Sequence, residues 1–206
     1  QDRSSAASDV YKRQVLTIAD RMKKLGYLTG FSGKWHLGPS NSSNPKHDPR
    51  ARGFDYYWVG SMESGSTNLS LNGKSVEHQS RKGLPAGVAN RVILQGKYGE
   101  SFIDFSQTGD KPFFLYLPLY APHIPLIKKS DPYYKKFPKL DYPHYDDWRD
   151  DRRRMGLALI KSIDDAVGGV MAKLREHGLE ENTMVLFTSD NGCLLYTSDA
   201  ADERSC

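Results

Sequence analysis

KPFFLYLPLYAPHIP, residues 111–125, contains one of the longest apolar runs in the chain. The run, Phe113–Leu119, has the length of a strand rather than of a helix. Short runs without polar alternation are typical of strands that are buried on both faces of a parallel sheet. We therefore expect Phe113–Leu119 to be a central strand, with His123 directly beyond its end.

Segments with a helical or a strand period lie on both sides of this run. The expected helices are Val15–Leu25, Asn90–Phe105 and Arg152–His177, and the further expected strands are Tyr27–Ser32 and the apolar Thr183–Ser189. Leu69–Val76 is expected to form a hairpin, because Asn72-Gly73 at its centre is a strong turn signal. Helices that alternate with apolar strands predict an α/β fold, with a mostly parallel sheet flanked by helices.

The composition excludes several classes of protein. Of 206 residues, 38% are hydrophobic and 26% are charged, which fits neither a disordered tail nor a membrane protein. No run approaches the roughly 18 apolar residues of a spanning helix. The net charge of +4 is spread along the chain, so we expect no nucleic-acid partner.

The two cysteines, Cys193 and Cys206, lie close to the end of the chain. The sequence before them therefore provides no disulfide, zinc-thiolate site or cysteine nucleophile. The terminal segments, residues 1–14 and 193–206, carry no helical or strand period that continues into their neighbours, and they resemble translated sequencing adapters. We expect both segments to be non-native and residues 15–192 to be an internal fragment of a larger domain.

Polar clusters follow three of the expected strands: Lys34 with His36, then His123, then Asp190 with Asn191. Parallel sheets bind ligands beyond the carboxyl ends of their strands, so these side chains are the candidates for a functional site.

Each cluster has a functional and a structural interpretation. Lys34 and His36 are two residues apart, so an extended segment directs both to one side, where they suit an oxyanion such as sulfate or phosphate. Alternatively, they are a solvated lysine beside a hydrogen-bonded histidine. His123 lies between prolines that stiffen the backbone, which suits a directed ring, but a histidine that caps a strand fits equally well. Asp190 and Asn191 offer hard oxygen ligands for Ca²⁺ or Mg²⁺, or form a polar turn.

Longer segments carry a resemblance that the single clusters do not. GYLTGFSGKWHLG (26–38), RGFDYYWVG (52–60), KPFFLYLPLYAPHIP (111–125) and NTMVLFTSDNG (182–192) together resemble the formylglycine-dependent sulfatases of the alkaline phosphatase superfamily. The resemblance implies an incomplete fold of the alkaline phosphatase and sulfatase type.

The resemblance also implies roles for these residues. Lys34 matches the lysine that contacts sulfate and the nucleophile, and His36 matches the histidine that helps to deprotonate the formylglycine diol. His123 matches the histidine that holds sulfate and assists protonation of the leaving group. Asp190 and Asn191 match two ligands of the divalent cation, usually Ca²⁺, with Mg²⁺ as the alternative.

Some features of the family are missing from the sequence. The nucleophile motif, Cys-x-Pro-x-Arg or Ser-x-Pro-x-Arg, does not occur, and neither do the paired aspartates that precede it. We therefore expect the parent protein to be a sulfuric ester hydrolase and this fragment to be inactive. Alternatives are a phosphodiesterase or phosphonate hydrolase of the same superfamily, and a non-catalytic relative that binds sulfated glycans.

The resemblance further implies a sulfated small molecule or glycan as the substrate, with carbohydrate sulfates favoured. It implies a formylglycine-generating or maturation enzyme as a partner of the full-length parent, and a location in the periplasm or outside the cell. Ala121–Trp148 is rich in proline and tyrosine and has no period, so we expect a long loop. The loops expected near the substrate are Pro39–Arg50, Glu63–Gly83 and Lys128–Trp148, and the aromatic rings of the last either stack on a sugar or pack internally.

Overall fold

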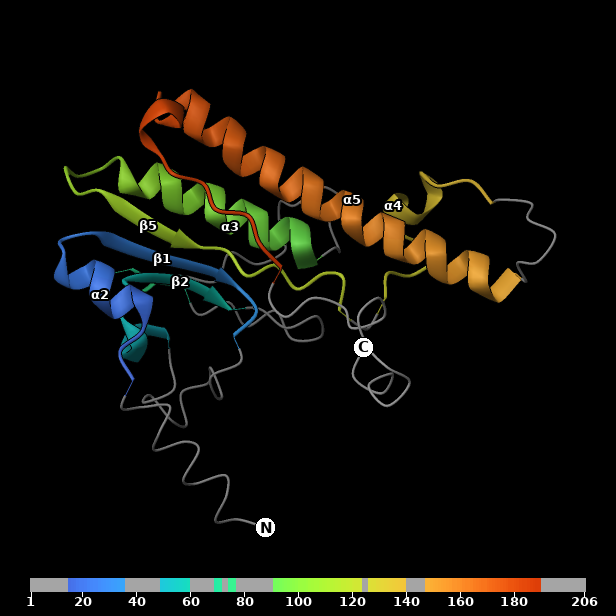
Figure 1. Ribbon diagram of the computed structural model, residues 1–206, viewed down its shortest axis with the longest axis horizontal. Coiled ribbons are helices and arrows are strands. Elements are labelled where there is room, and N and C mark those ends of the chain that lie inside the picture. The colour runs from blue at the N-terminus through green and yellow to red at the C-terminus, as the bar shows by residue number, and fades with distance from the viewer. Residues whose placement is uncertain are drawn as a thin grey trace, which may run out of the picture.

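The computed structural model describes residues 15–35, 49–59, 69–71, 74–76, 91–123, 126–139 and 147–189. Its main sheet has three parallel strands in the order β2-β1-β5. These strands are β1 (Leu28–Gly33), β2 (Tyr56–Val59) and β5 (Phe113–Tyr116). Figure 1 shows all three arrows pointing the same way, so their carboxyl ends share one edge. The expected α/β class is confirmed.

β1 is the central strand of the described sheet, and the prediction that Phe113–Leu119 is central and fully buried is wrong for this structure. β5 lies at the edge, its residues are partly exposed, and Tyr116 is 48% exposed. Pro118 lacks the amide hydrogen that would continue the strand, although its carbonyl still accepts from Lys34 N at 2.8 Å. The strand therefore ends earlier than its apolar character suggests.

β2 was not expected from the sequence, although its side chains point in turn to the two faces of the sheet. Tyr56 and Trp58 belong to the cluster on one face of the sheet, and Tyr57 belongs to the cluster on the other. All three side chains are less than 5% exposed. Because both faces are covered, apolar and polar residues do not alternate, and the usual strand signal is missing.

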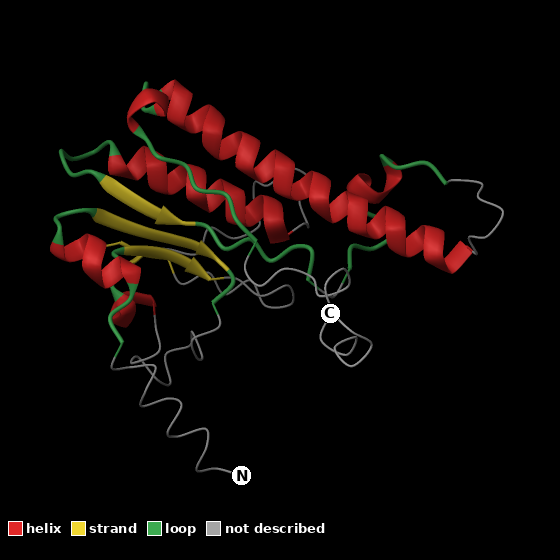
Figure 2. Ribbon diagram, in the orientation of Figure 1, coloured by secondary structure: helices red, strands yellow, loops and turns green. Residues whose placement is uncertain are grey.

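Helices cover both faces of the sheet (Figures 1 and 2). α3 (Arg91–Ser106) packs on one face, where Phe102 lies against Gly30 of β1, and α2 (Ile18–Lys24) packs on the other. α5 (Asp147–Glu176) lies along the outer side of α3. The three predicted helices are thus confirmed, with α5 beginning five residues earlier than expected.

The shorter elements are the hairpin strands β3 (Leu69–Leu71) and β4 (Lys74–Val76), the helix α4 (Pro132–Lys135), and the 3₁₀ turns η2 (Pro49–Arg52) and η3 (Glu180–Asn182). β3 and β4 pair in antiparallel fashion, as the turn signal predicts, while the turn residues lie outside the described residues.

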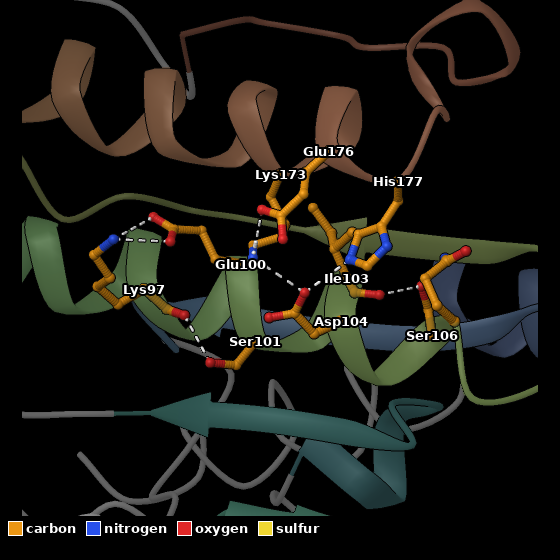
Figure 3. Close-up of polar contacts among 10 residues, drawn as sticks. Lys97, Glu100, Ser101, Ile103, Asp104, Ser106, Lys173, Glu176 and His177 are labelled. Atoms are coloured by element: carbon orange, nitrogen blue, oxygen red, sulfur yellow. Dashed lines mark hydrogen bonds and ion pairs between the residues drawn. The ribbon is translucent and has the colours of Figure 1, made fainter.

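α3 and α5 are joined by close backbone contact and by ion pairs. A Cβ on Gly96 of α3 would lie 2.8 Å from the Ala166 side chain of α5, so the glycine permits the close approach. At the other end of α3, Asp104 accepts from His177 at 2.8 Å and from Lys173 at 3.2 Å (Figure 3). The hydrogen bond from His177, followed by the contributions of Lys173, keeps the pKa of Asp104 below its ordinary value.

The prediction that Thr183–Ser189 is a buried strand is wrong for this structure. The segment is a loop (Figure 2), and Met184, Leu186 and Phe187 are 85%, 84% and 77% exposed. A strand requires a neighbour that pairs with its backbone, and no described strand pairs with this segment. Its apolar side chains consequently remain in solvent.

Candidate active site

Lys34 directly follows the carboxyl end of β1, and its own amide and the residue after it both make contacts that fix its backbone. Its backbone amide donates to Pro118 O at 2.8 Å. The next residue, Trp35, packs edge-on against Phe31 and Phe54, with ring centroids 5.2 and 6.2 Å apart. These contacts fix the backbone of Lys34 where β1 meets the segment that follows β5.

His123 lies seven residues after the end of β5, farther from the strand than the sequence predicts, because β5 ends at Tyr116. Its backbone amide donates to Tyr120 O at 3.1 Å, which closes a turn. The preceding Ala121 is buried against α3 and α5. The ring of His123 is therefore carried by a short turn that is anchored to the core.

Tyr120 brings the two candidate residues together. Its ring lies 5.2 Å from the ring of His123 between centroids, and Lys34 Nζ lies 5.4 Å from the Tyr120 centroid. A third group, the guanidinium of Arg91 at the beginning of α3, lies 3.9 Å from the same centroid. Three elements of the fold thus direct nitrogen-bearing side chains to one aromatic ring.

Gln95 of α3 joins the end of β1 to the segment that follows β5. Its side-chain Oε1 accepts from Tyr120 N at 2.9 Å, and its backbone carbonyl accepts from Ser32 Oγ at 2.7 Å. Gln95 is fully buried, and its Nε2 has no hydrogen-bond partner among the residues that the structure describes. A buried amide donor without a partner costs free energy, so apolar packing alone does not account for a glutamine here.

The charge of this cluster suits an anion. Lys34 forms no ion pair with a carboxylate within the described ranges, and its recorded partner is the ring of Tyr120. Burial lowers the pKa of Arg91, while the interaction with Tyr120 opposes that shift. A cation and an imidazole beside a partly buried guanidinium provide the donors that bind a tetrahedral oxyanion.

The other predicted site residues, His36, Asp190 and Asn191, lie outside the described residues. Among the residues that are described, no group of three or more histidine, cysteine, aspartate or glutamate side chains could hold a metal ion. Asp190 and Asn191 have the oxygen donors that Ca²⁺ prefers, but two donors do not complete a site. The structure places both Lys34 and His123 beside the ring of Tyr120, and the metal site stays a prediction.

Three residues of this cluster, Arg91, Gln95 and Tyr120, were not identified from the sequence. Arg91 had a usable signal, because a basic residue at the first position of a helix opposes the helix dipole and calls for another reason to be there. Gln95 is a polar residue on the otherwise mostly apolar, buried side of the same helix. Tyr120 directly follows the apolar run Phe113–Leu119, and nothing in the sequence distinguishes it from that run.

The tyrosines of the loop that follows are used for internal packing where they are described. Tyr133 donates from its hydroxyl to Asp165 of α5 at 2.7 Å, and Tyr134 donates to Asp151. Burial, and next the bond to Asp165, raise the pKa of Tyr133 to about 12. These two hydroxyl contacts hold α4 against α5.

The model of the family described as Sulfatase matches residues 4–205. The chain belongs to the sulfatase family. The recognition made from its motifs, a sulfatase of the alkaline phosphatase superfamily, is confirmed. Across the described residues, no helix of this sulfatase chain is long and apolar enough to cross a membrane.

Named relatives of this sulfatase come from bacteria and mammals. The chain is 30% identical over 190 residues to the sulfatase YdeN of Escherichia coli K12, an alignment that covers 82% of this chain and 31% of YdeN. It is 28% identical over 201 residues to N-acetylgalactosamine-6-sulfatase of Canis lupus familiaris, covering 88% of this chain and 33% of the relative. The sequence thus spans about a third of the length of these two relatives.

The fold is also similar to that of solved structures. The crystal structure of Ps i-CgsB in complex with k-i-k-neocarrahexaose superposes with a TM-score of 0.59 at 24% identity, over 81% of this chain and 38% of that one. The sulfatase-like fold is thereby confirmed, as part of a larger domain.

Proposed function

We propose that this chain is part of the catalytic domain of a sulfatase that hydrolyses sulfate esters, with carbohydrate sulfates as its substrates. The observation that carries the proposal is the convergence of Lys34 and His123 on the ring of Tyr120 at the carboxyl edge of the sheet. The family of the chain supports the reaction, and the position of the cluster supports the site.

The residues of the chain divide the work by their chemistry. Lys34 neutralises the charge that sulfate oxygens carry and that grows on the bridging oxygen as the S–O bond breaks. His123, as an imidazolium, gives its proton to that bridging oxygen, so that the leaving group departs as a neutral alcohol. His36, two residues after Lys34, is the base that takes a proton from the nucleophile.

Two groups that the family uses lie beyond what these residues can supply. A formylglycine hydrate would supply the attacking hydroxyl, but the sequence contains neither form of the motif from which it is made. Asp190 and Asn191 would be two of the ligands of Ca²⁺ or Mg²⁺. We accordingly propose that residues 15–192 are an internal piece of the domain and that the piece alone is inactive.

The names of the relatives support a sugar substrate. One relative is an N-acetylgalactosamine-6-sulfatase, and one solved structure holds the oligosaccharide k-i-k-neocarrahexaose. A maturation enzyme that makes formylglycine in the full-length parent, and a periplasmic or extracellular location, belong to the same proposal.

Two experiments test this function. Purified chain, assayed with a chromogenic aryl sulfate, is expected to give no turnover above the buffer control. Sequencing through the parent gene is expected to reveal Cys-x-Pro-x-Arg or Ser-x-Pro-x-Arg upstream of Val15, with paired aspartates before it. Turnover by the chain alone, or a parent gene that encodes no nucleophile motif, would contradict the proposal.

A further inference from the structure

We propose that Tyr120 is a positioning residue, which holds Lys34 and His123 at a fixed separation so that both reach one tetrahedral anion. The inference rests on the proposed function, because it assigns Tyr120 to the same site. Tyr120 acts through its neighbours and is not itself assigned a contact with substrate.

The ring of Tyr120 contacts side chains from three different elements. Lys34 follows β1, His123 follows β5, and Arg91 begins α3, with distances to Tyr120 of 5.4, 5.2 and 3.9 Å as defined above. A lysine side chain is long and flexible, and the face of an aromatic ring attracts its ammonium within about 6 Å. The ring therefore restricts a group that would otherwise sample many positions.

The backbone of Tyr120 is fixed independently of its ring. Gln95 accepts from Tyr120 N through Oε1 and from Ser32 Oγ through its backbone carbonyl. Ser32 is two residues before Lys34, and Tyr120 is three before His123. One fully buried residue of α3 thus sets the distance between the chain segments that carry the two candidate groups.

Arg91 restrains the ring from a further direction. Its guanidinium lies closer to the Tyr120 centroid than Lys34 Nζ does, and its pKa is lowered mainly by burial. Lys34 and Arg91 both bring positive charge to the surroundings of this ring, so an anion that comes near both is attracted by both.

The test measures the binding of inorganic sulfate to the 206-residue chain by nuclear magnetic resonance, with labelled histidine rings. The His123 signal reports the site. His177 serves as an internal reference, because it is paired with Asp104 near the opposite end of α3 from Arg91. The variants are Tyr120→Leu, which removes the ring, and Tyr120→Phe, which keeps it. Tyr133→Leu is the matched control, since Tyr133 also has a cation, Lys136, 4.3 Å from its centroid.

We expect Tyr120→Leu to weaken sulfate binding at His123 by about fivefold or more, which is the effect of losing the cation–ring contact of Lys34 alone. Tyr120→Phe is expected to bind within about twofold of the unsubstituted chain, and Tyr133→Leu to leave the affinity unchanged. If Tyr120→Phe restores binding, the ring itself is what positions the two groups. A general loss of structure on replacing a tyrosine by leucine would instead weaken binding in both Tyr120→Leu and Tyr133→Leu.

A second variant keeps the test decisive if Tyr120→Leu does not fold. Gln95→Met preserves side-chain volume and removes the acceptor of Tyr120 N, so it is expected to weaken sulfate binding by about threefold or more, equivalent to one lost hydrogen bond. Sulfate binding that is equal in all variants would overturn the positioning role and leave the proposed function intact. No sulfate-dependent shift of His123 in the unsubstituted chain would overturn the anion site itself, and the positioning role with it.

Discussion

Replacing Gly33 with alanine is expected to separate the two strand ends that carry the candidate site. A Cβ at this position would overlap the Pro118 carbonyl oxygen and lie 2.8 Å from the carbonyl carbon. The clash is with backbone, so no side chain can rotate away to relieve it. Gly33 immediately precedes Lys34, whose amide donates to the same carbonyl at 2.8 Å.

The magnitude follows from these distances. Ordinary contact begins at 3.4 Å, and the carbonyl oxygen lies still closer to the added Cβ than the carbon does, so the backbones must separate by more than 0.6 Å (3.4 minus 2.8). The bond from Lys34 N to Pro118 O would then stretch beyond the usual 2.7–3.2 Å range of such hydrogen bonds. Overpacking of about 1–3 kcal/mol, added to about 1 kcal/mol for the weakened bond, predicts a loss of about 2–4 kcal/mol in the free energy of unfolding.

Urea unfolding of the chain, followed by circular dichroism, measures this loss, and sulfate titration measures the displacement of Lys34. Gly26→Ala is the matched control, because Gly26 has a φ of 87° but no atom within 4 Å of an added Cβ. It is expected to cost about 1 kcal/mol and to leave sulfate affinity unchanged. Equal losses for the two variants, or unchanged sulfate binding in Gly33→Ala, would refute the reasoning.

Three other predictions concern packing, solubility and pH. Gly96→Ala places a Cβ 2.8 Å from a side chain of α5 and should lower stability by about 1–3 kcal/mol. Gly168→Ala, whose Cβ meets no atom within 4 Å, should instead raise stability by about 0.5–1 kcal/mol. Thermal melts show whether each variant is less or more stable than the unsubstituted chain. Leu186→Lys should raise solubility and change stability by less than about 0.5 kcal/mol, because Leu186 is 84% exposed; aggregation that persists unchanged would argue against this segment as its cause. The pKa of Asp104 is held below 3.8, chiefly by His177. Its contribution to the free energy of unfolding is therefore present above that pH and is lost as the pH falls through the lower pKa of the folded state. Asp104→Asn should flatten the acid limb of a stability–pH curve, and an unchanged limb would exclude this contribution.

The helices were predicted well because each buries one side and keeps a regular period. α3 extends from Arg91 to Ser106, one residue from the predicted bounds at each end, and α5 ends within one residue of the predicted His177. Local signals, such as the left-handed Gly178 after α5, set these ends independently of the rest of the fold.

The strands were predicted less well because pairing depends on distant partners. The apolar character of Thr183–Ser189 predicts burial, but a strand also needs a neighbour, and the sequence of a segment does not state whether one is present. Conversely, β2 was missed, since a strand covered on both faces has no alternation.

Lys34 and His123 were candidates from the sequence and their roles stay predictions, whereas the residues that support them were missed. Lys34 and His123 were identified because polar groups past strand ends are chemically conspicuous. Gln95 and Tyr120 act through a hydrogen bond and an aromatic face, and these depend on a tertiary contact that no spacing in the sequence reveals.

The most direct measurement of the central claim is the rate at which the full-length gene product hydrolyses a chromogenic sulfate ester and the matching phosphate diester, before and after Lys34→Ala. The account predicts a preference for the sulfate ester, and a loss of about 10²–10³ in kcat when the charge of Lys34 is removed from the transition state. A preference for the phosphate diester, or an unchanged rate in Lys34→Ala, would contradict it.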